Sequence, residues 1–247
     1  MTQQGLDVFL IDFGTPDRTD RSLRFEDYLH DIDLALENAL ALSGSPSTTL
    51  LGYCLGGLFA VLYAALNPEK VRNLIALATP FDFSKGGPLY RWLQGLDVDR
   101  LVNAFGNIPG EWIRDQIRLF ASTTMPERNL RIWFDLLLHL WDREYLRRQH
   151  LLDHWLQDLL PFPGEAYRQF IKEFVQANKL VKRELFIGGR LIDLSRIICP
   201  VLILVHAEDI LAPPDSAKAL VGLVASEDGE FFEGKRSAIS GQLSASE

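Results

Sequence analysis

The sequence is short of cysteine and of positive charge. Cys54 and Cys199 are the only two cysteines among 247 residues, so the chain has no framework of disulfides. Lysine and arginine total 25 against 33 aspartates and glutamates, which gives a formal net charge of −8. Proteins that bind nucleic acid through its phosphates need clustered Lys and Arg. The composition therefore argues against nucleic acid as the main partner and favours a reducing compartment, the cytoplasm.

Targeting and membrane-spanning segments are missing as well. No apolar run approaches the roughly 20 residues of a membrane-crossing helix, and no basic start leads into an apolar stretch. No pair of His, Cys or acidic residues at ligand spacing is matched by a second pair elsewhere. We therefore expect no membrane span, no secretory signal and no metal site.

What the sequence does contain is a strand, turn and helix pattern around Cys54. An apolar run leads into Gly52-Tyr53-Cys54-Leu55-Gly56, and residues 59–66 are small and apolar. This is the layout of a nucleophile elbow, where the nucleophile has a strained backbone and two glycines let strand and helix approach. We expect Gly52 and Gly56 to fill that role, and the helix N-terminus to lower the thiol pKa. The alternative is that Cys54 is only a small buried hydrophobe.

Strands and helices alternate on both sides of this turn. The apolar run 6–13 predicts a buried parallel strand, residues 25–42 predict an amphipathic helix, and residues 71–78 predict another strand. This order is typical of an α/β layer fold.

Residues 79–198 differ in character from the rest. They hold all five tryptophans and helical patterns such as residues 129–148, without a convincing alternating strand. We interpret them as a helical cap inserted over the carboxyl ends of the strands. The predicted organisation is a core with the elbow (1–78), the cap (79–198), the resumed core with an acid turn (199–224) and a disordered tail (225–247).

Asp209 is the expected acid partner of Cys54. It follows the apolar run 200–206, and elbow enzymes carry their triad in the chain order nucleophile, acid, histidine. The alternatives are that Asp209 only stabilises the turn before Pro213, or that Glu208 is the acid. All five histidines precede Asp209, so none is placed as the base: His30, His139, His150, His154 and His206.

Together these motifs resemble the polyhydroxyalkanoate synthases, particularly the shorter type that works with a second subunit. The resemblance covers residues 5–220. It implies an α/β-hydrolase-like, mostly parallel sheet with a helical cap, with Cys54 acylated and Asp209 as the triad acid. The segments that carry it are Asp12-Phe13-Gly14-Thr15-Pro16, Gly52 to Gly57, Tyr167-Arg168-Gln169-Phe170, Asn178-Lys179-Leu180, Ile187-Gly188-Gly189, Cys199-Pro200-Val201-Leu202 and Asp209-Ile210-Leu211-Ala212-Pro213-Pro214.

The sequence departs from that family at both ends. Family members carry a Gly-His pair after the last strand, whereas residues 229–237 contain no histidine. Lys235 lies near that place, but an ammonium of ordinary pKa is a poor base at neutral pH. The family also has further strands and an oxyanion loop before the segment that opens here. We expect an incomplete sheet, with either a gap at its centre or direct pairing of residues 6–13 with residues 49–53.

The resemblance implies acyl transfer. Attack of the Cys54 thiolate on a hydroxyacyl-CoA exchanges one thioester for another, and the backbone N–H of Leu55 supports the oxyanion. CoA then enters with the substrate, so no separate cofactor is expected. The implied partners are the hydroxyacyl-CoA, the polyester chain, and a second synthase subunit or further copies of the chain, in the cytoplasm or at the surface of polymer granules.

Two other functions stay open at this stage. Dienelactone hydrolases carry the same Gly-x-Cys-x-Gly elbow, and a thioesterase would use it similarly, but dienelactone hydrolases lack an insertion like residues 79–198. Alternatively, the chain is a non-catalytic synthase-like binding subunit that kept the fold and lost the base.

Overall fold

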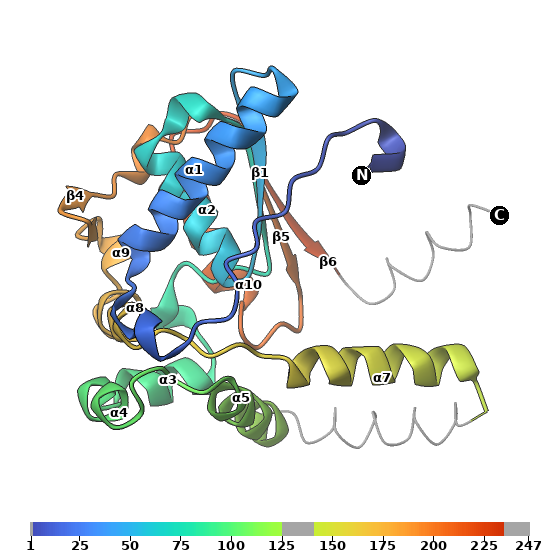
Figure 1. Cartoon of the computed structure of the whole chain (residues 1–247), viewed down its shortest axis with the longest axis vertical. Coiled ribbons are helices and arrows are strands. Elements are labelled where there is room, and N and C mark those ends of the chain that lie inside the picture. The colour runs from blue at the N-terminus through green and yellow to red at the C-terminus, as the bar shows by residue number, and fades with distance from the viewer. Residues whose placement is uncertain (1, 125–140, 235–247) are drawn as a thin grey trace. The chain divides into compact units, whose positions relative to one another are not determined.

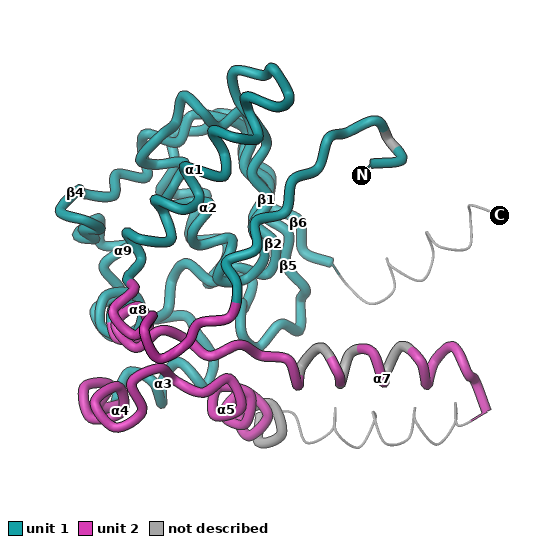
Figure 2. The backbone as a smooth tube through the Cα atoms, viewed as in Figure 1, with its two compact units in different colours: residues 1–14, 24–95, 169–247 teal, residues 15–23, 96–168 magenta. Residues whose placement is uncertain are grey.

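The computed structural model describes residues 2–124 and 141–234. The chain divides into two compact units (Figure 2). Unit 1 comprises Met1–Gly14, Arg24–Gly95 and Gln169–Glu247, and unit 2 comprises Thr15–Leu23 and Leu96–Arg168. The predicted cap boundaries, 79 and 198, stay a prediction.

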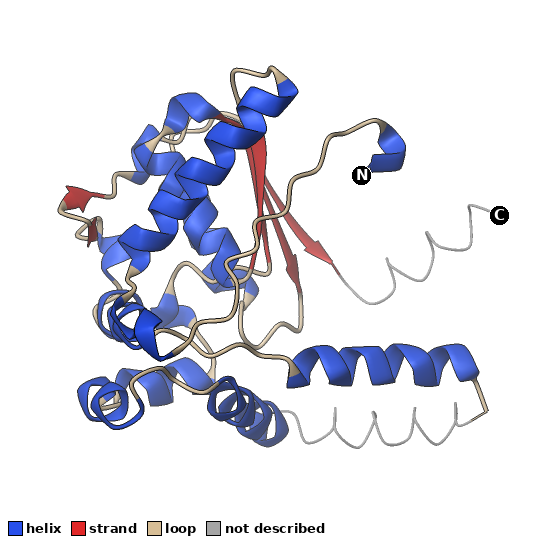
Figure 3. Ribbon diagram, in the orientation of Figure 1, coloured by secondary structure: helices blue, strands red, loops and turns tan. Residues whose placement is uncertain are grey.

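Unit 1 is built on a four-stranded parallel sheet in the order β1-β2-β5-β6 within the described residues (Figure 3). The strands are β1 (Thr48–Tyr53), β2 (Val71–Leu77), β5 (Val201–His206) and β6 (Gly229–Gly234). All three pairings are parallel, so the carboxyl ends of the strands lie along one edge of the sheet. Fold families with such sheets place their sites at that edge.

Helix α2 (Leu55–Leu66) packs against β1 and β2, and helix α1 (Phe25–Ser43) packs against α2 (Figure 1). α2 is the centre of the core because every residue from Gly57 to Leu66 is buried. α1 is amphipathic, as predicted, and buries Phe25, Leu29, Ile32 and Leu36. The ring of Phe25 lies 4.7 Å from that of Phe59 on α2, which joins the two helices.

The remaining elements of unit 1 are short. The helical ones are η1 (Thr2–Gln4), η3 (Pro68–Lys70), η4 (Phe83–Lys85), α3 (Pro88–Gln94), the π-helix η5 (Phe170–Gln176), α9 (Lys179–Lys182), η6 (Leu194–Arg196), α10 (Pro214–Lys218) and η7 (Ala219–Gly222). A hairpin joins β3 (Phe186–Ile187) to β4 (Arg190–Leu191), within a range for which the sequence predicts no strand.

Unit 2 is helical and has its own small core. It contains η2 (Arg18–Ser22), α4 (Val98–Phe105), α5 (Gly110–Thr124), α7 (Arg143–Gln157) and α8 (Gly164–Gln169), which ends at the boundary with unit 1. The Tyr167 ring packs 5.5 Å from Phe162, and Arg168 forms ion pairs with Asp99 and Glu165. Most of the helical pattern predicted at residues 129–148 lies outside the described residues.

The prediction of a strand at residues 6–13 is wrong. This segment belongs to no strand or helix, and Leu10 is 93% exposed. β1 stands at the edge of the sheet, with β2 as its single described partner. An extended apolar run becomes a strand only when a neighbouring strand accepts its backbone hydrogen bonds, and none does here. Neither expected arrangement is found, because the described sheet is continuous and residues 6–13 lie outside it.

The C-terminal prediction also needs correction. Residues 229–234 lie in the range expected to be disordered, yet they form β6. Six residues of β6 pair in continuous register with β5, from Val201 with Gly229 to His206 with Gly234. Backbone hydrogen bonding to a buried neighbouring strand orders this segment despite its few apolar side chains. Within residues 2–124 and 141–234, no helix has both the length and the apolar character of a membrane span.

Candidate active site

Cys54 occupies a strained turn between β1 and α2. Its backbone has φ 52° and ψ −119°, a left-handed conformation that costs a non-glycine residue about 1–3 kcal/mol. The Cys54 N–H donates to the Leu77 carbonyl on β2 over 2.9 Å, and its carbonyl accepts from the Gly57 N–H over 3.0 Å. These bonds on both sides hold the turn, so the predicted elbow geometry is confirmed.

Two glycines make room for the elbow, but they are not both the predicted ones. A methyl group at position 52 would lie 2.3 Å from the Gly56 carbonyl oxygen, so strand and helix backbones meet at Gly52. At position 56 a methyl group would meet nothing within 4 Å, so the prediction for Gly56 is wrong. The second required glycine is Gly57, where a methyl group would lie 1.9 Å from Thr79 Oγ1.

The environment of Cys54 raises the pKa of its thiol. Burial is the largest cause, and the negative charge of Asp209 raises the pKa further. A hydrogen bond from the Leu55 backbone N–H lowers it, as expected at a helix N-terminus, but does not prevail. The predicted lowering of the thiol pKa is therefore wrong in its net direction. Desolvation of the thiolate outweighs one N–H at the start of α2.

Asp209 lies in the turn after β5, and its negative charge affects the pKa of the Cys54 thiol. Its Oδ1 accepts from the N–H groups of Leu211 and Ala212, both over 2.9 Å. These bonds give Asp209 the turn-stabilising role that the sequence left open, while Oδ2 has no partner among the described residues. The neighbouring Glu208 is exposed, and Asp209 is the carboxylate that raises the thiol pKa. The structure thus brings Asp209, and not Glu208, into electrostatic range of Cys54.

No described histidine of unit 1 is hydrogen-bonded to Cys54. His206 ends β5, and its Nδ1 accepts from the Glu208 N–H over 3.1 Å. His30 is exposed on α1. In unit 2, His150 and His154 lie on α7, and His154 Nδ1 is 3.2 Å from Oδ2 of Asp158, which follows the helix. His139 and Lys235 lie outside the described residues.

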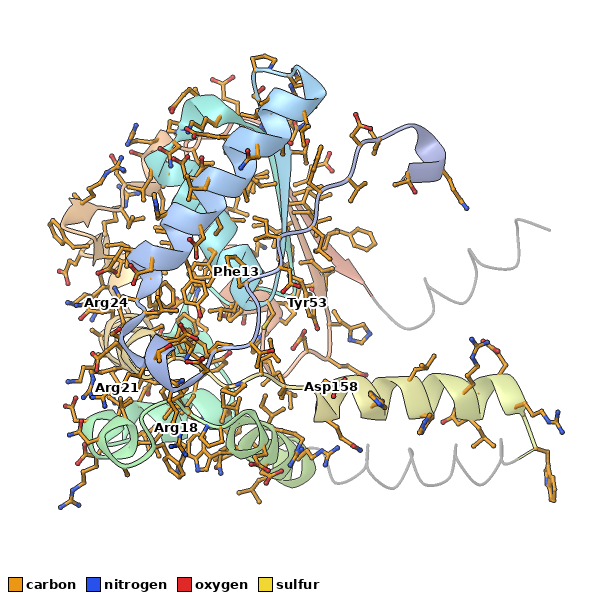
Figure 4. The ribbon with its side chains drawn as sticks, in the orientation of Figure 1. Phe13, Arg18, Arg21, Arg24, Tyr53 and Asp158 are labelled. Carbon is orange, nitrogen blue, oxygen red and sulfur yellow. The ribbon has the colours of Figure 1, made fainter. Side chains whose placement is uncertain are left out.

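Two tyrosines that the sequence does not point to, Tyr53 and Tyr90, also lie within electrostatic range of Cys54 and Asp209. Tyr53, labelled in Figure 4, lies at the end of β1. It is 50% exposed. Tyr90, on α3, is buried. The pKa of each phenol is raised by burial first, then by the charges of Cys54 and Asp209. No spacing signal marks Tyr90, which comes from a helix that the sequence assigns to the cap. Within the described residues, no cluster of His, Cys, Asp and Glu is suited to hold a metal ion.

Comparison with known proteins fits this geometry. The family described as the alpha/beta hydrolase fold matches residues 2–239. The poly(3-hydroxyalkanoate) polymerase subunit PhaC of Allochromatium vinosum is 39% identical, over 91% of this chain and 63% of that protein. The subunit of the same name from Haloferax mediterranei is 38% identical, over 95% of this chain and 48% of that protein.

Among the solved structures that resemble this chain is a monoacylglycerol lipase from Paleococcus ferrophilus. It is 19% identical with a TM-score of 0.45, and the match covers 87% of this chain and 66% of the lipase chain. The chain spans about half to two thirds of the length of the PhaC relatives it matches. The chain belongs to the α/β-hydrolase fold family and is similar, over most of its length, to the PhaC subunits of poly(3-hydroxyalkanoate) polymerases.

Proposed function

We propose that the chain is the catalytic part of an acyltransferase that polymerises 3-hydroxyacyl-CoA through a thioester on Cys54. The observation that carries the proposal is the strained cysteine at the strand–helix turn, with the Asp209 carboxylate in its field. The PhaC names of the relatives supply the substrate class. No separate cofactor is part of the proposal.

The reaction follows from the groups at the turn. The Cys54 sulfur attacks the thioester carbonyl, a new carbon–sulfur bond forms, and the bond to CoA breaks. CoA leaves as a thiolate and takes up a proton equivalent to the one lost by Cys54. In this step the Leu55 N–H, which bonds the sulfur in the free protein, supports the oxyanion. A hydroxyl group of a second acyl unit then attacks, forms an ester and regenerates the Cys54 thiol.

The test is acylation of the whole chain by 3-hydroxybutyryl-CoA. Intact-mass spectrometry should show one acyl group on the protein, with CoA released in the same amount. Cys54→Ser should lose the thioester, whereas Cys199→Ser, a change at the other free cysteine, should keep it. If Cys54→Ala released CoA at the wild-type rate, Cys54 would have no part in the reaction.

The product separates this function from its rivals. Ester oligomers support the polymerase, whereas free acid identifies a Cys-dependent hydrolase such as a thioesterase. No acylation, together with retained binding to a synthase subunit or to polymer, identifies a non-catalytic subunit. The raised thiol pKa is the observation that favours this last rival. The same proposal includes assembly with a second synthase subunit or with further copies of the chain. It also includes localisation in the cytoplasm or on polymer granules.

A further inference from the structure

Tyr90 is held rigidly beside the acid turn. It lies in the first turn of α3, whose preceding residue Gly87 approaches the Ile210 carbonyl so closely that a methyl group there would lie 3.1 Å from it. The Tyr90 ring packs edge-on against Phe83 with 5.1 Å between ring centres. A methyl group at Gly86 would lie 2.5 Å from the same ring. The ring is therefore fixed on two sides.

The hydroxyl of Tyr90 contrasts with its enclosed ring. The side chain is 7% exposed, yet its hydroxyl makes no hydrogen bond within the part of the chain that the structure describes. It is not among the fully enclosed polar atoms that lack a partner, so it keeps access to solvent. Buried Tyr63 shows the usual arrangement, because its hydroxyl donates to Asp33. Tyrosines of a core normally satisfy this group, which makes the unpartnered hydroxyl of Tyr90 a candidate for binding a ligand.

The surroundings keep the Tyr90 phenol protonated. Burial raises its pKa, and the charges of Cys54 and Asp209 raise it further, so both groups lie within electrostatic reach. A neutral phenol is a hydrogen-bond donor and acceptor but not a base at neutral pH. The ring of Phe83 packs against the Tyr90 ring, so one side of the phenol is apolar, and a hydroxyl group of a ligand buried there would need a hydrogen-bond partner.

We propose that the Tyr90 hydroxyl forms a hydrogen bond with the 3-hydroxyl group of the acyl chain bound at Cys54. Tyr90 is thereby a specificity residue that favours 3-hydroxyacyl over unsubstituted acyl groups. The inference rests on the proposed function. The acyl carbonyl has the Leu55 N–H as its donor, whereas the 3-hydroxyl group has no other donor assigned to it. Loss of one such hydrogen bond costs about 0.65–1.4 kcal/mol, or roughly three- to tenfold in discrimination.

The experiment compares 3-hydroxybutyryl-CoA with butyryl-CoA on the whole chain. Wild type should be acylated faster by the hydroxylated substrate. Tyr90→Phe should lower that ratio by roughly three- to tenfold and change the rate with butyryl-CoA by less than about twofold. Because the hydroxyl has no partner, Tyr90→Phe should unfold at nearly the wild-type temperature. Tyr63→Phe, which removes a bonded hydroxyl at the far end of α2, should unfold earlier but keep the ratio.

Binding separates failure of this inference from failure of the proposed function. In a Cys54→Ala background, the affinity ratio of the two CoA esters is measured by calorimetry, with and without Tyr90→Phe. A fall in the affinity ratio supports the role of Tyr90 even where wild type forms no thioester. An unchanged ratio, or an equal loss with both esters, overturns it.

Discussion

Cys54 combines a strained backbone with a thiol that remains protonated at neutral pH. The strain is held by backbone hydrogen bonds to Leu77 and Gly57. The protonation follows from burial, which the Leu55 N–H offsets only in part. The proposed function therefore needs a base that deprotonates Cys54 before it attacks the substrate.

The pH dependence of alkylation tests this at the residue scale. Because burial and Asp209 raise the pKa of Cys54, the thiolate forms only at alkaline pH, above the midpoint of about 8.5 for an exposed cysteine. In a Cys199→Ser background, iodoacetamide should therefore react with a midpoint above that value. Asp209→Asn removes a nearby negative charge and should lower the midpoint. A midpoint below that of a free cysteine would contradict the effect of burial.

The three glycines of the elbow provide a matched comparison. Gly52→Ala and Gly57→Ala insert a methyl group into the Gly56 backbone and the Thr79 side chain, respectively. Each should lower the free energy of unfolding by about 1–3 kcal/mol or more. Gly56→Ala meets open space and should be neutral, or stabilising by up to about 1 kcal/mol within a helix. Urea unfolding measures all three, and a Gly56→Ala loss as large as that of Gly52→Ala would refute the assignment.

Between elements, a polar network ties α1 and α2 to the segment before β2. The Tyr63 hydroxyl and Lys70 Nζ both bind Asp33 Oδ1, and Lys70 Nζ also lies 3.1 Å from Glu37 Oε1. Burial pulls the pKa of Asp33 upward, but the hydrogen bonds from Lys70 and Tyr63 lower it on balance. The ionised Asp33 carboxylate, with its bonds to Lys70 and Tyr63, thus stabilises the contact between α1 and α2.

Acid should remove this contribution. A carboxylate whose pKa is lowered by folding adds stability above its unfolded pKa of about 3.9, and the contribution disappears as pH falls through the folded pKa. Asp33→Asn should therefore lower the free energy of unfolding at pH 7 and have a smaller effect at pH 3. Urea unfolding of both proteins at the two pH values measures it. An effect of equal size at pH 3 would show that charge is not involved.

For the whole molecule, the proposed reaction requires a base that removes the proton of the Cys54 thiol. His30 and His206, the described histidines of unit 1, have no hydrogen bond to the thiol. The expected consequence is slow acylation that an added base accelerates. With 3-hydroxybutyryl-CoA, the rate of thioester formation should rise in proportion to imidazole concentration. Cys54→Ala measures the background reaction of imidazole with the substrate, and a rate independent of imidazole would indicate a base within the chain.

The sequence alone determined the parts of this protein that depend on local pattern. Helix α1, strands β1, β2 and β5, and the elbow at Cys54 follow from apolar spacing and from Gly-x-Cys-x-Gly between a strand and a helix. Asp209 was placed in a turn after a strand by the same kind of signal. These features were predictable because neighbours in sequence specify them.

The tertiary structure decided whatever depends on a partner far away in the chain. Residues 6–13 look like a strand but pair with no strand in the described part of the chain, whereas polar residues 229–234 pair with β5. Gly57 replaces Gly56 because Thr79 happens to lie against it. The thiol pKa rises because burial by distant segments outweighs one local N–H. Strand pairing, close packing and desolvation arise between residues remote in sequence, so no local pattern records them.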